Sequence, residues 1–250
     1  MVEPFETVAA RPPQEPPVET SDSGIRPSPN IWNDPEVYEV ENRGVDRAGV
    51  IWSAMRSHAD WTGRDVLDVG CGTGFHLPHF AGSARSVTGV EPHQALAAIA
   101  RRRVRRLPSV SVLTGVAGDL PLPDSSVDVV HARWAYFFGP GCEPGLAELD
   151  RVVRRGGAAF VVDNDPERST FGGWFRRGFP EVDPQEVARF WSLRGWSRER
   201  LDIAWTFDSR ADFEAVVRIE LPTAVAEQVL AEHPAVTGVD YAVNLWWKSF

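Results

Sequence analysis

The sequence predicts an α/β protein built on a parallel sheet with helices on both faces. From about residue 61, short apolar runs alternate with helical patterns, which is typical of parallel strands joined by crossover helices. The first apolar run leads directly into three glycines separated by single residues, in VLDVGCGTGFH at 66–76. Hydrophobic residues make up 43% of the 250-residue chain, which is sufficient for one large core.

Seven apolar runs along the chain predict seven strands. The helix after the second strand is expected to end in RRRVRR at 101–106, where cations favour the negative pole of the helix dipole, so we interpret this run as a solvated face. The helix before the fifth strand is predicted to end at Gly156-Gly157, because glycine readily adopts the left-handed conformation. A helical stretch between the last two strands is interrupted at Pro222. The strands are expected at 65–69, 86–90, 110–115, 127–135, 158–163, 202–209 and 241–250.

The pattern divides the chain into five parts. Residues 1–28 are rich in proline and polar residues, so we expect a disordered tail. Residues 29–60 are expected to form an N-terminal helical cap, 61–165 the ligand-binding core, and 201–250 the C-terminal part of the core sheet. Between them, 166–200 form an aromatic and arginine-rich insert, which could bury its own small core or close over the site as a lid.

Composition excludes several classes of function. A net charge of −9 argues against nucleic acid as the main partner, because phosphate backbones require a positive field. No apolar run approaches the roughly 20 residues that span a bilayer, and no secretory signal is evident, so we expect a cytoplasmic protein. The two cysteines, Cys71 and Cys142, form neither a disulfide framework nor a zinc site, and we predict no metal. The oligomeric state is not predictable from these features.

The glycine-rich turn after the first strand predicts a ligand that touches the backbone. Such a turn aims the N-terminus of the next helix at the ligand. Its spacing, Gly70-x-Gly72-x-Gly74, differs from the G-x-G-x-x-G of dinucleotide-binding proteins. Asp68 precedes it, and a carboxylate there would repel a pyrophosphate but suit a ligand with a positive group such as an ammonium.

Four motifs in this order resemble the class I S-adenosylmethionine (SAM)-dependent methyltransferases, of the small-molecule, methyltransferase type 11-like kind. They are DVGCGTG, VTGVEP, GVAGDLPLPDSSVDVV and LAELDRVVRRGGAAFVV, which together cover roughly residues 60–165. The resemblance implies a Rossmann-like, doubly wound seven-stranded sheet, parallel with a final antiparallel strand, and the two C-terminal runs fit it. It also implies SAM as the cofactor.

The resemblance assigns cofactor-binding roles to particular residues. The three glycines would approach the methionine part of SAM, and Asp68 would help to fix the loop and the amino group. Glu91 would accept hydrogen bonds from both ribose hydroxyls, which suits the two oxygens of a carboxylate. The complete expected set is Asp68, Gly70, Cys71, Gly72, Gly74, His76, Glu91, Pro92, Val116, Ala117 and Arg133.

The sequence departs from the family pattern at the adenine site. Related sequences carry an aspartate that accepts from the adenine amino group, where this chain has Val116. Valine cannot accept a hydrogen bond, so adenine would be held by the Ala117 N–H and by packing, at a loss of about 1 kcal/mol. Alternatively, Asp119 would reach back into the same place.

Candidate catalytic residues follow the fourth and fifth strands, whose carboxyl ends face the cofactor. His131 could act as a general base or pack structurally between sheet and helix, and Asp163 could be a functional acid or cap a loop. Arg133 could also hold a substrate anion or pair with Asp163. The residues expected to contact the acceptor are Trp32, Tyr38, Trp134, Tyr136 and Trp174.

These observations predict transfer of a methyl group from SAM to a small-molecule acceptor by direct in-line displacement. Because SAM carries an activated methyl group, the protein has only to align the acceptor, exclude water and, for some acceptors, remove a proton. The alternative is a catalytically inactive SAM-binding protein with a regulatory or interaction role, which Val116 and the lack of an evident base would fit. The glycine spacing disfavours a third possibility, a nicotinamide-dependent oxidoreductase. The acceptor and the methylated atom are not predictable.

Overall fold

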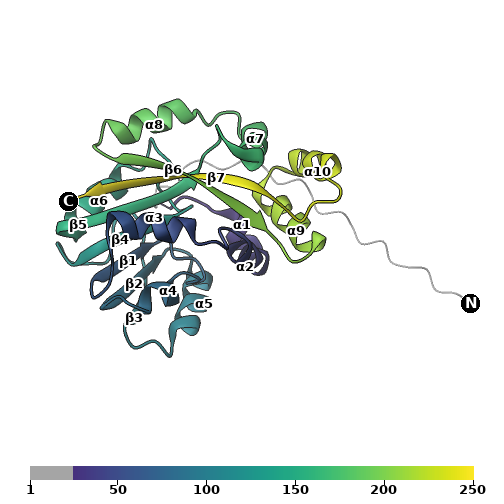
Figure 1. The fold of residues 1–250 in the computed structure, drawn as a ribbon. Helices are drawn as coiled ribbons and strands as arrows, with labels where there is room; N and C mark the ends of the chain where they lie inside the picture. Colours follow the sequence, from purple (N-terminus) through teal and green to yellow (C-terminus); the bar gives the residue numbers. More distant parts are fainter. Residues whose placement is uncertain (1–24) are drawn as a thin grey trace, which may run out of the picture.

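All seven strands form one sheet in the order β3-β2-β1-β4-β5-β7-β6 (Figure 1). The structure, a computed structural model, describes residues 25–250, so most of the predicted disordered tail lies outside the described residues. Strands β1 to β5 pair in parallel, and β7 lies antiparallel between β5 and β6. The predicted doubly wound mixed sheet is thus confirmed. The strand bounds are β1 Asp65–Val69, β2 Ser86–Glu91, β3 Val110–Thr114, β4 Val127–Arg133, β5 Val153–Asn164, β6 Ser197–Thr206 and β7 Gly238–Ser249.

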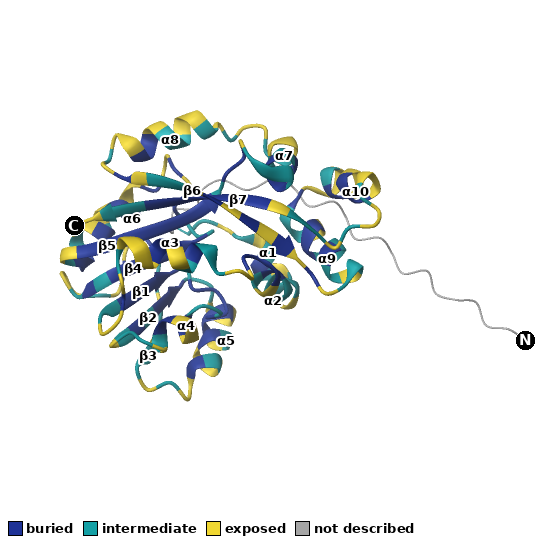
Figure 2. Ribbon diagram, in the orientation of Figure 1, coloured by how far each residue is buried: buried dark blue, intermediate teal, exposed yellow. Residues whose placement is uncertain are grey.

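Helices cover both faces of this sheet. One face packs against α3, α4 and α5, and the other against α6 and α8, while α7, α9 and α10 lie near the end of β6 and β7. Figure 2 shows the consequence: the central strands are almost wholly buried, and the helices expose one stripe. The helix bounds are α1 Pro29–Asn33, α2 Pro35–Gly44, α3 Val50–His58, α4 Leu77–Ala81, α5 Gln94–Val104, α6 Glu143–Val152, α7 Ser169–Gly178, α8 Pro184–Ser192, α9 Arg210–Glu220 and α10 Thr223–Glu232.

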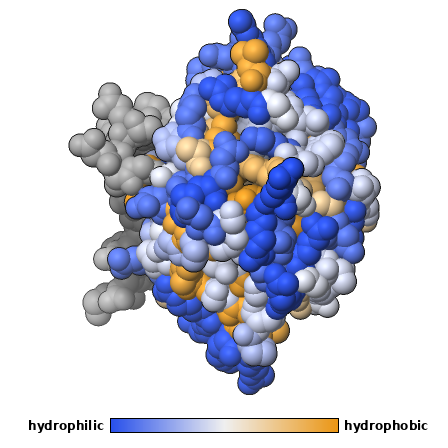
Figure 3. All heavy atoms as spheres, turned by 90° about the vertical axis from the view of Figure 1, so that its left-hand side faces the viewer, coloured by the Kyte–Doolittle hydropathy of each residue, from blue (hydrophilic) through white to orange (hydrophobic). Residues whose placement is uncertain are grey.

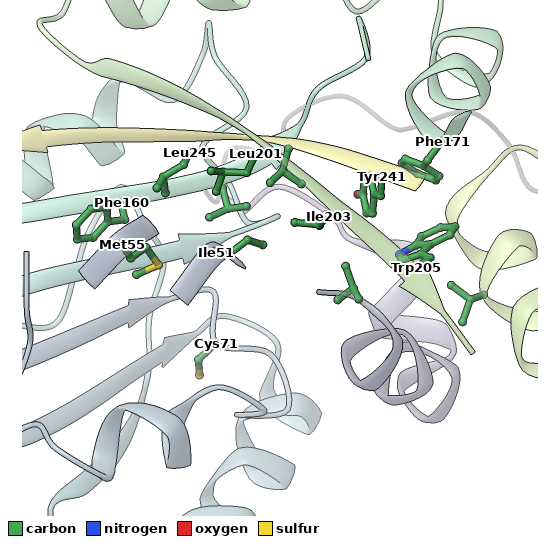
Figure 4. Packing of buried hydrophobic residues seen from close by; sticks show 14 of the residues in the cluster. Ile51, Met55, Cys71, Phe160, Phe171, Leu201, Ile203, Trp205, Tyr241 and Leu245 are labelled. Atoms are coloured by element: carbon green, nitrogen blue, oxygen red, sulfur yellow. The ribbon is translucent and has the colours of Figure 1, made fainter. Parts of the chain in front are cut away.

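Aromatic side chains dominate the core where β6 and β7 meet α7. Trp205 of β6 and Tyr241 of β7 have ring centroids 5.3 Å apart, and Phe171 of α7 lies 4.4 Å from each of them. Figure 4 shows these three rings together, and shows Ile51 and Met55 of α3 on the same side as Phe160 of β5. Offset and edge-on aromatic pairs add about 0.5–1.5 kcal/mol each beyond their buried area. The C-terminal strand pair is therefore fixed firmly against the core.

The predicted end of α6 at Gly156-Gly157 is wrong. The helix ends at Val152, and Val153 already has extended backbone and begins β5. Between Val127 and Val129 the β4–β5 register shifts, and Gly156, with φ of +82°, lies in the resulting irregularity. Its N–H donates to the carbonyl of Phe250 at 2.7 Å. Glycine at this position allows a bulge in β5. The local sequence pattern does not reveal the contact of Gly156 with Phe250.

Other boundaries differ only modestly from the prediction. The helical stretch before β7 is interrupted at Pro222, as predicted, and β6 begins at Ser197 within the predicted insert. The predicted N-terminal cap contains α1, α2 and α3, of which α3 contributes buried Ile51 and Met55 to the sheet core. No helix among residues 25–250 has the length and apolar character that crossing a membrane requires.

The parallel strands β1 to β5 end on the same side of the molecule, beside α1 and α2 (Figure 1). In doubly wound sheets, ligands bind at the carboxyl ends of the strands. The opposite side, near the C-terminus, displays hydrophilic residues interspersed with smaller hydrophobic areas (Figure 3). A ligand site is therefore expected beside α1 and α2.

Candidate functional site

A narrow cavity of about 100 Å³ lies at the carboxyl ends of β1 to β4. Its floor consists of the residues that follow these four strands, and α1 and α2 contribute its cover. Most of the predicted cofactor set lines it: Gly70, Cys71, Gly72, His76, Glu91, Pro92, Val116, Ala117 and Arg133. Trp32, Tyr38, Trp134 and Tyr136 of the predicted acceptor set also line it.

The glycine loop between β1 and α4 needs its glycines. Gly70 and Gly72 have φ of +70° and +54°, the left-handed region that side chains disfavour. A Cβ at Gly70 would come within 2.4 Å of the Ala135 Cβ, and one at Gly72 within 2.7 Å of Ile31 Cδ1. The first contact is between two short, fixed groups and cannot be relieved easily. The loop therefore has glycine at the positions where α1 and the end of β4 approach it.

Glu91, the last residue of β2, is the carboxylate of this cavity. It is only 4% exposed, and burial raises its pKa although two backbone N–H groups oppose that effect. Its Oε2 accepts from the Gly72 N–H and its Oε1 from the His93 N–H, each at 2.9 Å. Each oxygen retains a further lone pair. Glu91 thus connects the glycine loop to the start of α5 and can still accept from a ligand.

The turn after β3 forms the far end of the cavity. Val116 pairs with Asp119 across a tight turn, in which the Asp119 N–H donates to the Val116 carbonyl at 3.1 Å. Asp119 is exposed and does not line the cavity. The alternative in which its side chain replaces the missing acceptor is therefore not supported. Ala117, in contrast, is buried and lines the cavity.

A polar contact that sequence reasoning missed ties the glycine loop to α2 and α5. The Thr73 hydroxyl donates to Glu39 Oε1, and Arg103 Nη2 donates to Glu39 Oε2 at 2.7 Å. Arg103 belongs to the run interpreted as a solvated face, so that interpretation is wrong for this residue. The three residues lie at least 30 positions apart in sequence. Only the fold brings them together.

Asp68 and His131 form a buried pair beneath the glycine loop. They are register partners on β1 and β4, and His131 Nδ1 lies 2.7 Å from Asp68 Oδ1. His131 is fully buried, does not line this cavity, and packs against Trp52 and Phe80 with ring centroids 5.5 and 5.2 Å away. This location fits the structural interpretation of His131 and argues against its being a general base. Asp68 supports the loop from below and does not line the cavity.

His76, at the N-cap of α4, lines the cavity, whereas His131 does not. Burial first, and then the nearby charge of Arg133, holds the pKa of His76 well below its usual range. A neutral imidazole is therefore expected at this position. Gly74 lies behind it against Ala100 of α5 and supports helix packing instead of lining the cavity.

A second, larger cavity of about 480 Å³ adjoins the first. Arg26, Pro27 and Phe138 line both. The second cavity is mainly apolar, with phenylalanine, valine and proline side chains from α7, the α7–α8 connection and α8. Its polar lining includes Asp163, Asn164 and Asn244, contributed by β5 and β7.

Asp163 is the buried carboxyl group of this second cavity. Burial raises its pKa to about 7, although Asn244 and Trp246 donate to its Oδ1 at 3.0 and 3.2 Å and oppose that effect. Its Oδ2 has no hydrogen bond to any residue in 25–250. A carboxyl group of this kind can gain or lose a proton near neutral pH, as general bases must.

The predicted insert contributes to the second cavity, but not through Trp174. Trp174 is 3% exposed and packs against Phe213 and His233, with ring centroids 6.3 and 5.3 Å away. It lines neither cavity, so its assignment to the acceptor is not supported. Its neighbour Phe175 and, beyond α7, Phe179 line the second cavity instead. The helical phase of α7, which the aromatic composition does not specify, decides between them.

Two cavity-lining aromatic residues after β4 have strained backbone. Trp134 and Tyr136 have φ of +48° and +54°, which is uncommon for bulky residues. The Trp134 indole N–H donates to Asn164 Oδ1 at 2.8 Å, and the Tyr241 hydroxyl donates to the same oxygen. These bonds connect the first cavity to β5 and β7. Backbone strain that the surrounding contacts maintain is found preferentially at functional sites.

Comparison with known proteins identifies the central part of the chain. Residues 67–161 match the family described as a methyltransferase domain. A Mycolicibacterium smegmatis protein named as a probable S-adenosylmethionine-dependent methyltransferase is 38% identical over 131 residues, covering 52% of this chain and 48% of its own. A 2-phytyl-1,4-naphtoquinone methyltransferase of Synechococcus elongatus is 35% identical over 123 residues, covering 47% and 51%. The chain thus spans about half the length of these two relatives.

Solved structures agree on the fold. A SAM-dependent methyltransferase from Aquifex aeolicus superimposes with a TM-score of 0.55 at 18% identity, over 85% of this chain and 96% of its own. At this identity the likeness speaks for the fold alone. It confirms the predicted sheet architecture, and the family match is to residues 67–161 of the chain.

Proposed function

We propose that this chain, whose residues 67–161 match a methyltransferase domain, transfers a methyl group from SAM to a small, mainly apolar acceptor. One observation carries the proposal. The buried Glu91 carboxylate and the bare glycine loop are joined at 2.9 Å and face one cavity, which opens beside a larger apolar one. A nucleoside with a short charged tail would occupy the first cavity, and an acceptor would occupy the second.

The nucleoside would extend across the ends of β3, β2 and β1. Glu91 would accept from the ribose hydroxyls with the lone pairs that Gly72 and His93 leave free. The Ala117 N–H and the surrounding apolar side chains would hold adenine, because Val116 offers no side-chain acceptor. The methionine part would then lie over Gly70 and Gly72, on the side of β4.

The chemistry requires little of the protein beyond alignment and proton removal. When bound, SAM supplies a methyl group on a positively charged sulfur. The acceptor atom forms a bond to the methyl carbon, and the sulfur keeps the electrons of the broken S–C bond. The apolar walls of the second cavity would hold the acceptor in line and exclude water. Asp163 Oδ2 would take the proton that the acceptor loses, since the pKa of this carboxyl group is about 7.

The lining of the second cavity favours an apolar ring compound. Phe175, Phe179 and Val187 offer flat and aliphatic surfaces, and Asp163 and Asn244 offer polar contacts at one side. The naphthoquinone methyltransferase among the relatives supports an acceptor of this kind. We therefore propose a small aromatic acceptor with an acidic O–H or ring C–H group.

Two measurements test this function in sequence. Isothermal titration calorimetry with SAM and with S-adenosylhomocysteine should give binding heat, and its absence for both would refute the proposal. Transfer of a radiolabelled methyl group from SAM should then be sought with 1,4-dihydroxynaphthalene and with a metabolite extract. Binding without transfer to any compound would instead favour the catalytically inactive SAM-binding protein.

A further inference from the structure

Arg133 is a buried cation in the first cavity whose guanidinium lacks an acceptor. It is the last residue of β4, and only 8% of it is exposed. Its Nε and Nη2 have no hydrogen-bond partner, and it forms no ion pair with any carboxylate in 25–250. Buried guanidinium groups are normally paired, because removing the charge from water is strongly unfavourable. Such a group is expected to meet its partner in a ligand-bound state.

The residues around Arg133 do not supply that partner. Its guanidinium lies 4.4 Å from the Trp134 ring, and the nearby hydroxyls of Tyr38 and Tyr241 are neutral. Asp46 is the carboxylate whose charge acts most strongly on the pKa of Arg133. Its oxygens already accept hydrogen bonds from the N–H groups of Val50 and Ile51, at 2.8 and 2.9 Å. The predicted pairing of Arg133 with Asp163 is absent from the structure.

Glu41 does not pair with Arg133 either, whose Nε and Nη2 have no hydrogen-bond partner. Burial and the neighbouring carboxyl group of Glu220 raise the pKa of Glu41 well above its usual range. Glu220 in turn accepts from Asn30 Nδ2 at 2.6 Å. Neither carboxyl group of this pair forms a hydrogen bond or an ion pair with Arg133.

The strand order fixes which part of a bound nucleoside Arg133 would meet. Glu91 ends β2 and Ala117 follows β3, whereas Arg133 ends β4, on the opposite side of β1. A ligand with its sugar at Glu91 and its base beyond β3 must direct its remaining part across the glycine loop toward Arg133. In SAM, that remaining part ends in an amino acid with a carboxylate.

We propose that Arg133 binds the carboxylate of the cofactor's methionine part, and that this contact selects an amino-acid-bearing nucleoside over the bare one. This inference rests on the proposed SAM-binding function. The same guanidinium chemistry would suit a carboxylate of the acceptor, and the ligands below distinguish the two sources. Arg47, which lines neither cavity and pairs with Asp208 at 2.9 Å, is the control.

The test compares S-adenosylhomocysteine with 5′-methylthioadenosine, which has the same nucleoside and thioether but no amino acid. Calorimetry on Arg133→Gln should show S-adenosylhomocysteine binding weakened about 10- to 100-fold, the range that one charge-assisted contact supplies. Binding of 5′-methylthioadenosine should change less than about threefold. Arg133→Lys should recover part of the loss, and Arg47→Gln should leave the ratio of the two affinities unchanged.

Each alternative result has a definite meaning. An equal loss for both ligands in Arg133→Gln would make Arg133 a structural residue, and no loss for either would leave only an acceptor carboxylate; both overturn the inference. If the variant does not fold, the wild-type protein decides. It should prefer S-adenosylhomocysteine over its decarboxylated analogue by about tenfold or more, and equal affinity would overturn the inference. Failure of the wild type to bind any of these nucleosides would instead contradict the proposed function itself.

Discussion

The substitution Asp163→Asn should make the protein more stable above neutral pH while removing its proton acceptor. Asparagine has the same shape, and its Oδ1 can still accept from Asn244 and Trp246, as the Asp163 carboxyl group does at 3.0 and 3.2 Å. Only the ability to ionise is lost. The effect of the substitution on stability therefore isolates the cost of a charge in the second cavity.

The size of this cost follows from the pKa. Burial raises the pKa of Asp163 from 3.8 to about 7, so the folded state holds the proton more tightly than the unfolded state. The wild-type protein therefore loses stability as pH rises from about 4 through about 7, whereas Asp163→Asn has no proton to lose at this position. At about 1.4 kcal/mol per pH unit, the full difference is about 4 kcal/mol, of which about 2–3 kcal/mol develops between pH 5 and pH 8.

Urea unfolding of both proteins at pH 5 and pH 8 measures this difference. The advantage of Asp163→Asn in unfolding free energy should be larger at pH 8 by about 2–3 kcal/mol. Asp208→Asn is the control, because the Asp208 side chain is 83% exposed and its substitution should give the same small effect at both pH values. An advantage of Asp163→Asn that does not depend on pH would refute the assignment of a raised pKa. In the same variant, methyl transfer should fall at least about 100-fold with SAM affinity unchanged.

Four further substitutions test the rest of the site. Glu91→Gln should weaken S-adenosylhomocysteine binding about 10- to 100-fold in calorimetry, because it removes a charged acceptor; unchanged binding would exclude Glu91 from the sugar contact. Gly70→Ala should lower the unfolding free energy by at least about 2 kcal/mol, since its φ is +70° and the Ala135 Cβ lies 2.4 Å from the added carbon; a urea midpoint equal to that of the wild type would contradict this. Trp174→Ala should cost about 3–5 kcal/mol of stability yet leave the KM for the acceptor unchanged, whereas Phe175→Ala should raise that KM; a higher KM in Trp174→Ala would return that residue to the acceptor site.

The sequence predicts the sheet well because strands buried on both faces carry a strong local signal. The run DVLDV at 65–69 has the bounds that the structure gives, and Glu91 ends the next strand, beside the glycine loop. Chain order and alternation therefore suffice to bring Gly72 and Glu91 to one edge of the sheet. The final strand pair is also correct in number, and the antiparallel insertion of β7 between β5 and β6 matches the fold that the family resemblance implies.

Features that depend on distant residues were not predictable. Asp163 owes its environment to Asn244 and Trp246, which become its neighbours only through the antiparallel β5–β7 pairing. His131 looks like a candidate base in the sequence, but its register partner Asp68 turns it into a buried support. Gly156, similarly, serves a strand irregularity instead of a helix end. The cytoplasmic location and the acceptor remain predictions.

A crystal structure with S-adenosylhomocysteine bound would show whether Glu91 holds the ribose. Both ribose hydroxyls should lie within hydrogen-bond distance of the Glu91 carboxylate, and the sulfur should face the cavity that contains Asp163. A complex in which Glu91 bonds only to Gly72 and His93, with the nucleoside elsewhere, would contradict it.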